Sequence, residues 1–390
     1  MDQPIADQLR HFDVFDESTA EQRYDVFRYA QSHAPVAHTD ADDGYYNVTR
    51  FEDIRTICEN PDTFSSTQPG VRHVPVRLPP LDEDPPLHRD YRMILNKFFA
   101  PNYLKRYEDD MRELVHEVID RFIDRGECEF VSEFAIPFTA GSLARVVLDE
   151  GNEERVARAV EVVTRIAVEG TPEAYGEVAM LAAEFMADRE ASGSDRDDVL
   201  TALVNGTIDG RLLTPEERLG VVTVLFLGGL DTTRGAIVNI GYHLAAHPGV
   251  EARLRDPLWV QTDLDEFLRY ETTVSVMGRV VTQDTELNGC PLTAGDKVAI
   301  HFNMANRDPD KFERPDELVF DREANPHIAF GLGIHRCLGL HFARIQISMA
   351  FNELLTRVTN VRLKPSAEFR RTAGVSFPSP DILHLEFDRV

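Results

Sequence analysis

The spacing of apolar and polar residues along the chain predicts helices for most of its length and strands in a few places. Gly44–Arg50 (GYYNVTR) alternates like a strand. Thr285–Phe302 predicts a hairpin that turns at Asn288-Gly289, with a further strand over Val298–Phe302, and the segment around His384–Phe387 alternates again. We therefore expect a mainly α protein with small peripheral β-sheets, folded as a single domain over residues 1–390.

The clearest helix signal begins at Thr214. Thr214-Pro215-Glu216-Glu217 has the pattern of a capping box with proline at the first helical position, and the next stop signal is His247-Pro248-Gly249. The helix between them should hold about 33 residues and measure roughly 50 Å. Its middle is apolar on all sides, which predicts burial through the centre of the molecule.

The sequence GGLDTT, at Gly228–Thr233, is unusual in the middle of such a helix. A glycine there costs up to about 1 kcal/mol relative to alanine, and a buried aspartate needs a partner. One interpretation is a helix kink with a hydrogen-bonded Asp231. The other is functional: the glycines admit a large group, a threonine hydroxyl opens the helix locally, and Asp231 and Thr232 form a proton relay at a cavity.

A lone cysteine follows a glycine-rich loop in HIAFGLGIHRCLGLHFAR, His327–Arg344. Leu338, Phe342, Ile345 and Met349 recur at helical spacing after it, so Cys337 should lie near a helix N-terminus, where free N–H groups lower the pKa of a thiol. Three interpretations stay open on these residues: a buried cysteine that packs as a small apolar side chain, a zinc site with His335 and His341, and a single axial thiolate to haem iron.

Composition narrows the classes of partner. The 390 residues carry 41 basic and 67 acidic side chains, a net charge of −26, which argues against nucleic acid or an anionic membrane as the main partner. The four scattered cysteines fit a reducing cytoplasm, and the polar N-terminus predicts neither a signal peptide nor an anchor. The longest apolar stretch, Gly220–Leu230, is too short to span a membrane.

Several motifs together resemble those of the cytochromes P450, the haem-thiolate monooxygenases. The family pattern FGxGxHxCxG is met at Phe330, Gly331, Gly333, His335, Cys337 and Gly339. Gly228–Thr233 resembles the oxygen-activation motif, Glu266–Arg269 matches ExxR, and Asp84–His88 with Arg92 resembles DPPxHxxxR. Ala305–Pro309 matches as well. The resemblance runs from about residue 40 to the C-terminus and is closest to the soluble bacterial members, including the camphor-hydroxylating type.

The resemblance implies a long central helix over a haem b (iron protoporphyrin IX) group whose iron is bound by the Cys337 thiolate, with Phe330, Gly331 and Gly339 in the surrounding loop. It implies that the haem propionates are held by His88, Arg92, Arg279 and His335. Asp231 and Thr232 would deliver protons during O₂ activation. One oxygen atom would then enter an organic substrate.

The resemblance also implies a buried pair, Glu266 and Arg269, that supports the cysteine loop. The family's third partner of this pair is an Arg or His two residues after a proline, but Pro315 is followed by Asp316 and Glu317. Arg314 or Arg322 is expected to replace it.

Family positions imply a substrate pocket lined by small, mostly apolar side chains. The expected residues are Val74, Val76, Val224, Leu227, Gly228, Val274, Ser275, Val375, Ser376 and Phe377. This lining favours a compact hydrophobic substrate, such as a terpenoid or a small aromatic compound.

Charge clusters in the acidic chain point to an electron donor. Leu87–Arg106 carries five basic residues (Arg89, Arg92, Lys97, Lys105 and Arg106) against Asp90, and His327–Arg344 carries Arg336 and Arg344 with no acid. We expect Arg89, Arg92, Arg336 and Arg344 to face an acidic ferredoxin, reduced in turn by an NAD(P)H-dependent reductase. The alternatives are a peroxide-driven peroxygenase on the same fold and a haem-thiolate sensor without turnover.

Overall fold

The computed structural model describes residues 8–16, 22–74, 77–148, 154–155, 158, 161–162, 172–193, 195–365, 367–371 and 379–390. Its longer helices are α2 (Arg23–His33), α3 (Phe51–Glu59), α4 (Leu87–Leu95), α6 (Glu108–Asp120), α7 (Ile136–Leu148), α9 (Pro172–Ser192), α11 (Pro215–Ala246) and α16 (Leu340–Arg357). Shorter helices are α5 (Pro101–Leu104), α10 (Val199–Asn205), α12 (Val250–Leu254), α13 (Trp259–Thr262), α14 (Leu264–Tyr270) and α15 (Phe302–Ala305). The mainly helical fold with small sheets is thus confirmed.

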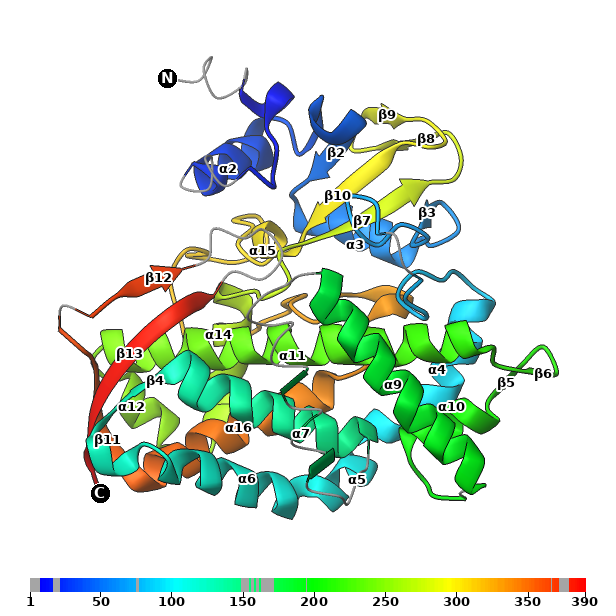
Figure 1. The fold of residues 1–390 in the computed structure, drawn as a ribbon. Coiled ribbons are helices and arrows are strands. Elements are labelled where there is room, and N and C mark those ends of the chain that lie inside the picture. Colours follow the sequence, from blue (N-terminus) through cyan, green and yellow to red (C-terminus); the bar gives the residue numbers. More distant parts are fainter. Residues whose placement is uncertain are drawn as a thin grey trace.

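The strands form small sheets at the edge of the helical body (Figure 1). One sheet has the order β1-β2-β10-β7-β3, with β1 (Val36–Thr39), β2 (Tyr45–Val48), β10 (Lys297–His301), β7 (Val276–Val281) and β3 (Phe64–Ser65). A second joins β11 (Val358–Leu363), β13 (Pro380–Arg389), β12 (Phe369–Arg371) and β4 (Glu127–Glu129). Two hairpins complete the set: β5 (Thr207–Ile208) with β6 (Arg211–Leu212), and β8 (Thr285–Leu287) with β9 (Cys290–Leu292).

The predicted strands and turn are present. β8 and β9 pair antiparallel across Asn288 and Gly289, whose φ values of 49° and 78° are those of a type I′ hairpin. The strand expected over Val298–Phe302 is β10, which ends at His301 because Phe302 begins α15. The C-terminal strand β13 is longer than the four-residue pattern that predicted it.

Helix α11 crosses the middle of the molecule, with α7, α9, α16 and strands β11 and β13 packed around it (Figure 1). The capping box is formed: Glu217 N–H donates to Thr214 Oγ1 at 3.2 Å, and Thr214 N–H donates to Glu217 Oε2 at 2.7 Å. The helix has 32 residues and His247 as its C-cap, so its predicted bounds are confirmed. It is apolar enough to pass as a membrane span, but most of that apolar surface is buried inside the protein.

Helix α11 runs through the centre of the molecule as predicted, and one turn of it has an open face. Phe226 and Leu230 are buried, whereas Val224 and Leu227 are half-buried and Gly228 is exposed. A Cβ atom added at Gly228 would meet no atom within 4 Å. This turn of the central helix therefore borders open space, which is what a bound group beside the helix requires.

Candidate functional site

The cysteine loop is a tight main-chain structure in front of α16. The Cys337 N–H donates to the Phe330 carbonyl at 2.8 Å, and the Gly331 N–H donates to the Ile328 carbonyl at 2.9 Å. Gly333 has a φ of +67°, and a Cβ there would lie 2.1 Å from the carbonyl oxygen of Cys58 in α3. Only glycine fits at this contact, because any side chain would collide with backbone. The loop holds Cys337 three residues before α16 begins, as predicted.

Cys337 is a free cysteine that is partly accessible, although protein surrounds its thiol on most sides. Burial raises the pKa of the Cys337 thiol, while the Gly339 N–H and the Arg92 and Arg336 cations act in the opposite direction. The sequence predicted the lowering contribution of backbone N–H but not the larger effect of burial. A buried thiol with donors and cations aimed at it is suited to bind a metal ion as thiolate, since the ion supplies the missing positive charge.

Four basic side chains from three separate segments lie close to the cysteine loop. The His88 and His335 rings are 4.3 Å apart between centroids, and Arg92 Nη1 donates to the Arg336 carbonyl at 3.1 Å. Burial, followed by the Arg92 cation, lowers the pKa of His88 to about 4. Burial, followed by Arg279, His88 and Arg92, lowers the pKa of His335 to about 2. The sequence therefore identified residues that the fold does bring together.

This cluster fits an anionic group. His88 Nε2 and His335 Nε2 are buried and have no hydrogen-bond partner among the described residues. Asp84 is the nearest acid by its effect on His88 and Arg279, but its carboxylate already accepts from Ser65 Oγ and from the Ser66 N–H. Buried polar nitrogens are nearly always paired, so unpaired donors beside two arginines point to a missing acidic ligand. The two carboxylates of haem match this need.

Glu266 in α14 is the centre of a buried ionic network. Arg269 binds it with two hydrogen bonds of 2.8 Å, and Arg322 Nε donates to Glu266 Oε2 at 2.9 Å. Asn325 Nδ2 and the Val319 N–H donate to the same carboxylate.

Arg269 also donates to three carbonyls, those of Asn306, Pro315 and Glu317. Arg322 thus occupies the third position of the network, whereas Arg314 pairs with Glu317 at the surface.

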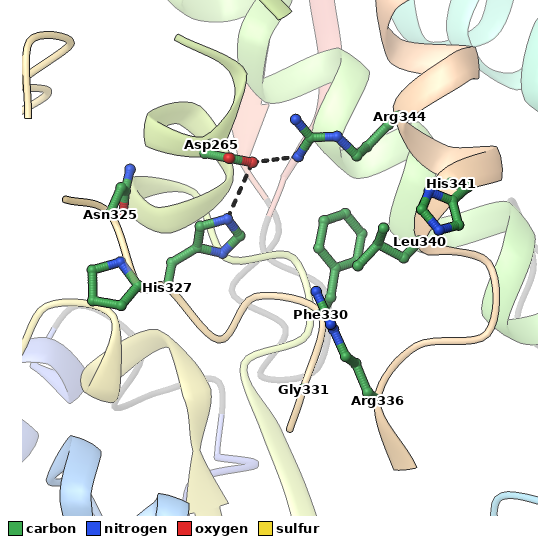
Figure 2. Close-up of a pocket in the computed structure, with 10 residues that line it drawn as sticks. Asp265, Asn325, His327, Phe330, Gly331, Arg336, Leu340, His341 and Arg344 are labelled. Carbon is green, nitrogen blue, oxygen red and sulfur yellow. Dashed lines mark hydrogen bonds and ion pairs between the residues drawn. The ribbon is translucent and has the colours of Figure 1, made fainter. Parts of the chain in front are cut away.

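A second carboxylate, Asp265, joins the same helix to both ends of the cysteine loop. Figure 2 shows it between His327 and Arg344. His327 Nε2 lies 3.3 Å from Asp265 Oδ1, the Arg344 guanidinium contacts the same oxygen, and the Ala329 N–H donates to His327 Nδ1 at 3.2 Å. Burial acts to raise the pKa of Asp265, but hydrogen bonds from His327 and Arg344 and their charges outweigh it and lower the pKa to about 2. The sequence did not reveal this contact, although Asp265 is adjacent to Glu266 and His327 begins the loop.

The pocket drawn in Figure 2 has a volume of about 440 Å³ and opens beside the cysteine loop. Phe330, Arg336, Leu340 and His341 line it together with the Asp265 group. His341 lies here, and His335 lies against His88, so the two do not converge on Cys337. Among the described residues no group of three His, Cys, Asp or Glu side chains could hold a metal ion, which disfavours the zinc interpretation.

The predicted basic face divides into free and paired cations. The guanidinium groups of Arg89 and Arg336 are exposed and have no ion-pair partner among the described residues. Lys97 and Arg106 pair with Asp197, Arg344 pairs with Asp265, and Arg92 is half-buried against the loop. Of the four predicted partner-binding residues, Arg89 and Arg336 are therefore the two whose charge is available at the surface.

The oxygen-activation motif lies on the open face of α11. Thr232 Oγ1 donates to the Gly228 carbonyl at 2.6 Å, the back-bond that the functional interpretation expects, although the helix continues through it. Asp231 Oδ1 lies 3.4 Å from Arg234 Nε in the following turn. Burial raises the pKa of Asp231, and the Arg234 cation opposes that effect. Arg234 was missed in the sequence, although its i+3 spacing from Asp231 signals a shared helix face.

The expected substrate-contacting residues are only partly described. Val224, Leu227, Val74 and Val274 are half-buried, Gly228 is exposed and Ser275 is buried. Val76, Val375, Ser376 and Phe377 lie outside the described residues.

Comparisons with known proteins agree with this fold and site. The cytochrome P450 family model matches residues 260–378. Putative cytochrome P450 YjiB of Bacillus subtilis (strain 168) is 30% identical over 336 residues, which are 83% of this chain and 84% of that protein. The methyl-branched lipid omega-hydroxylase of Mycobacterium tuberculosis (strain ATCC 25618 / H37Rv) is 30% identical over 346 residues, with coverages of 82% and 79%.

The substrate-free structure of Mycobacterium marinum cytochrome P450 CYP150A6 matches with a TM-score of 0.86 at 25% identity, covering 98% of this chain and 100% of that one. These likenesses place the molecule among the haem-iron oxygenases. The chain belongs to the cytochrome P450 family. It is a monooxygenase that uses an organic substrate, O₂ and a redox partner, as the enzymes of that family do.

Proposed function

We propose that this protein is a monooxygenase for a compact hydrophobic substrate, with haem b held between the cysteine loop and the open face of α11. The observation that carries the proposal is the pair of unsatisfied histidine nitrogens, His88 Nε2 and His335 Nε2, beside Arg92 and Arg279 and close to the loop of Cys337. When bound, the haem supplies reductive activation of O₂. The chain's own residues then perform binding, orientation and proton delivery.

On the cysteine side, Cys337 would hold the haem iron as thiolate, and the four basic residues would hold the propionates. The network around Glu266 fixes the segment that leads into the loop. Arg269 donates hydrogen bonds to three carbonyls of that segment, those of Asn306, Pro315 and Glu317. The Gly333 contact with α3 leaves the loop no room to slide. These contacts keep the Sγ atom in place without a second ligand from the protein.

On the α11 side, Asp231 and Thr232 carry protons. The Thr232 hydroxyl donates to the Gly228 carbonyl at 2.6 Å, so its proton has a defined resting position and its oxygen can still accept another hydrogen bond. Gly228 leaves space next to that hydroxyl. Asp231 would receive protons from solvent and pass them to Thr232.

Electrons would arrive from an acidic ferredoxin that docks beside the cysteine loop and is reduced by an NAD(P)H-dependent reductase. Arg89 and Arg336 support this partner because they are exposed, unpaired cations in a chain of net charge −26. The 440 Å³ pocket next to Arg336 offers the partner a concave contact. We propose a soluble, cytoplasmic protein, consistent with its free cysteines.

The substrate is sought among bicyclic terpenoids, small aromatics and, because a relative is a methyl-branched lipid omega-hydroxylase, branched fatty acids. Each compound is added to the haem-loaded protein, and a low-to-high spin shift of the Soret band reports displacement of water by a hydrophobic molecule. Compounds that shift the band are incubated with a plant-type ferredoxin, its reductase, NADPH and ¹⁸O₂. One ¹⁸O atom in the product is expected.

The outcomes separate the alternatives. Product formed with hydrogen peroxide alone, as fast as with the ferredoxin system, would make the protein a peroxygenase. Spin shifts without any product from either system would favour a haem-thiolate sensor.

A further inference from the structure

Among the described residues, Arg234 is the buried cation that contacts the carboxylate of the proposed proton relay. Its side chain is about nine-tenths buried and lies on α11 one turn beyond Asp231, with Nε 3.4 Å from Asp231 Oδ1. Neither of these two atoms has a hydrogen-bond partner among the described residues, so the contact between them is an ion pair without a well-formed hydrogen bond. Each charge therefore depends on the other, because a buried charge without a partner is strongly unfavourable.

The surroundings of this ion pair contain no competing charge among the described residues. Among the described residues, Arg234 is the one titratable group that shifts the pKa of Asp231. From α7, Leu143 packs on Gly229, and from the segments after α14 and before β13, Thr273 and Ser379 pack on Gly235. None of these side chains titrates, so Arg234 alone opposes burial.

We propose that Arg234 is a positioning residue for proton delivery: its guanidinium keeps the Asp231 carboxylate charged and fixed on the open side of α11, ready to accept a proton from solvent. This inference rests on the proposed relay through Asp231 and Thr232, but it assigns a new element to it. When a neutral residue replaces Arg234, burial alone acts on Asp231 and disfavours its charged form. The aspartate would then stay protonated and could not take up the next proton.

The sign of the pH dependence follows. Relay activity that needs ionised Asp231 is present above its pKa and is lost as pH falls through it. Burial raises that pKa and Arg234 lowers it. Removing the Arg234 cation therefore moves the acid limb of the rate profile to higher pH, while the rate at alkaline pH approaches that of the unaltered enzyme.

The test needs no organic substrate. Oxygen consumption by the haem-loaded protein, driven by NADPH with a plant-type ferredoxin and its reductase, is measured between about pH 6 and 9 in H₂O and D₂O. Below the pKa, the charged fraction of a carboxylate falls about tenfold with each pH unit. If Arg234→Gln moves the acid limb of the profile up by about one pH unit, the rate at the acid end should fall about tenfold. The same substitution should also increase the solvent isotope effect, and Arg234→Lys should restore part of the rate.

Arg218→Gln is the matched control. Arg218 lies on the same helix, is equally buried and pairs with the exposed Glu190 at 3.6 Å, more than three turns from Asp231. The pH profile of this variant should superimpose on that of the unaltered protein. Any effect of pH on the electron donors would appear in both profiles and is thereby accounted for.

The outcomes are distinguishable from failure of the relay itself. Slow Asp231→Asn with an unchanged Arg234→Gln profile and isotope effect would overturn the inference and leave the relay standing. Asp231→Asn at the full rate would instead overturn the relay. If Arg234→Gln does not retain haem, the double variant Arg234→Gln/Asp231→Asn should regain it, because it leaves no unpaired charge; equal instability of both variants would contradict the pair.

Discussion

The cysteine loop and the open face of α11 are built in opposite ways. Around the loop, two adjacent carboxylates, Glu266 and Asp265, tie α14 to Arg322, Arg344 and His327, and main-chain hydrogen bonds close the loop itself. On α11 the open face is glycine, half-buried aliphatic side chains and one ion pair. The loop side is held by many contacts, which serve to keep the cofactor in place. The α11 side has few contacts, so we expect its individual residues to affect the reaction more than the stability.

The largest expected effect is at the centre of the loop side. Cys337→Ser should abolish the absorption band that reduced, CO-bound haem shows with a thiolate ligand, together with product formation, because serine replaces the soft thiolate by a weak oxygen ligand. CO difference spectra of the dithionite-reduced protein measure this. Cys290→Ser, at a half-buried free cysteine in the β8–β9 hairpin, serves as control and should keep the full band. An intact band in Cys337→Ser would exclude this ligand.

The next effect tests which arginine completes the Glu266 network. Arg322→Gln should lower the free energy of unfolding by about 3 kcal/mol, because it removes charge-assisted hydrogen bonds to the buried Glu266 and to two carbonyls. Denaturant unfolding of the haem-loaded protein, followed at the Soret band, measures it. Arg314→Gln is the matched control, and loss of its exposed pair with Glu317 should cost under about 1 kcal/mol. Equal losses in the two variants would contradict the assignment.

The sequence predicted most of the architecture because the signals were local. The capping box at Thr214, the Asn288-Gly289 turn and the glycines of the cysteine loop each impose a conformation on their own neighbours. The four propionate-binding candidates are brought together by the fold as the resemblance implied. The apolar pattern predicted a central helix for α11, but apolar residues around a helix do not reveal which of its faces is open.

Tertiary pairings were less accessible to sequence reasoning. No local sequence pattern shows that Arg322 contacts Glu266 in place of Arg314, because the two residues are 56 positions apart. The same holds for Asp265 and Arg344, which are 79 positions apart. The partners of the surface cations were hidden for the same reason: Asp197 neutralises Lys97 from a distant loop. The residues expected to contact the substrate come from four segments and are mostly small and apolar, so no motif marks them.

A smaller, more specific effect is expected on α11. Thr232→Ala should leave oxygen uptake running while product per O₂ consumed falls at least about tenfold, because the hydroxyl that holds the relay proton is gone. Oxygen electrode traces with parallel product and peroxide assays, using a compound that gives a spin shift, measure this ratio. Thr233→Val, one residue on and buried, is the control and should stay coupled. Unchanged coupling in Thr232→Ala would contradict the assignment of the relay proton to this hydroxyl.

The smallest expected effect lies at the surface beside the cysteine loop, where charges are screened by water. Arg336→Glu should slow reduction of the haem by an acidic plant-type ferredoxin about fivefold at low salt, since a pair of exposed charges about 4 Å apart is worth about 1 kcal/mol. The difference should fade as added salt shortens the screening length to about 10 Å at 0.1 M. Stopped-flow reduction under CO, at several salt concentrations, measures it.

The control for this surface effect is Arg389→Glu, the same charge reversal near the C-terminus, at the end of β13, far from α4 in Figure 1. It should leave the rate of reduction unchanged, because a change in net charge alone acts weakly at that distance. Equal slowing in both variants would mean that the acidic partner responds to overall charge. Slowing confined to Arg336→Glu would show that the loop which holds the thiolate also presents the cation that receives the electron donor.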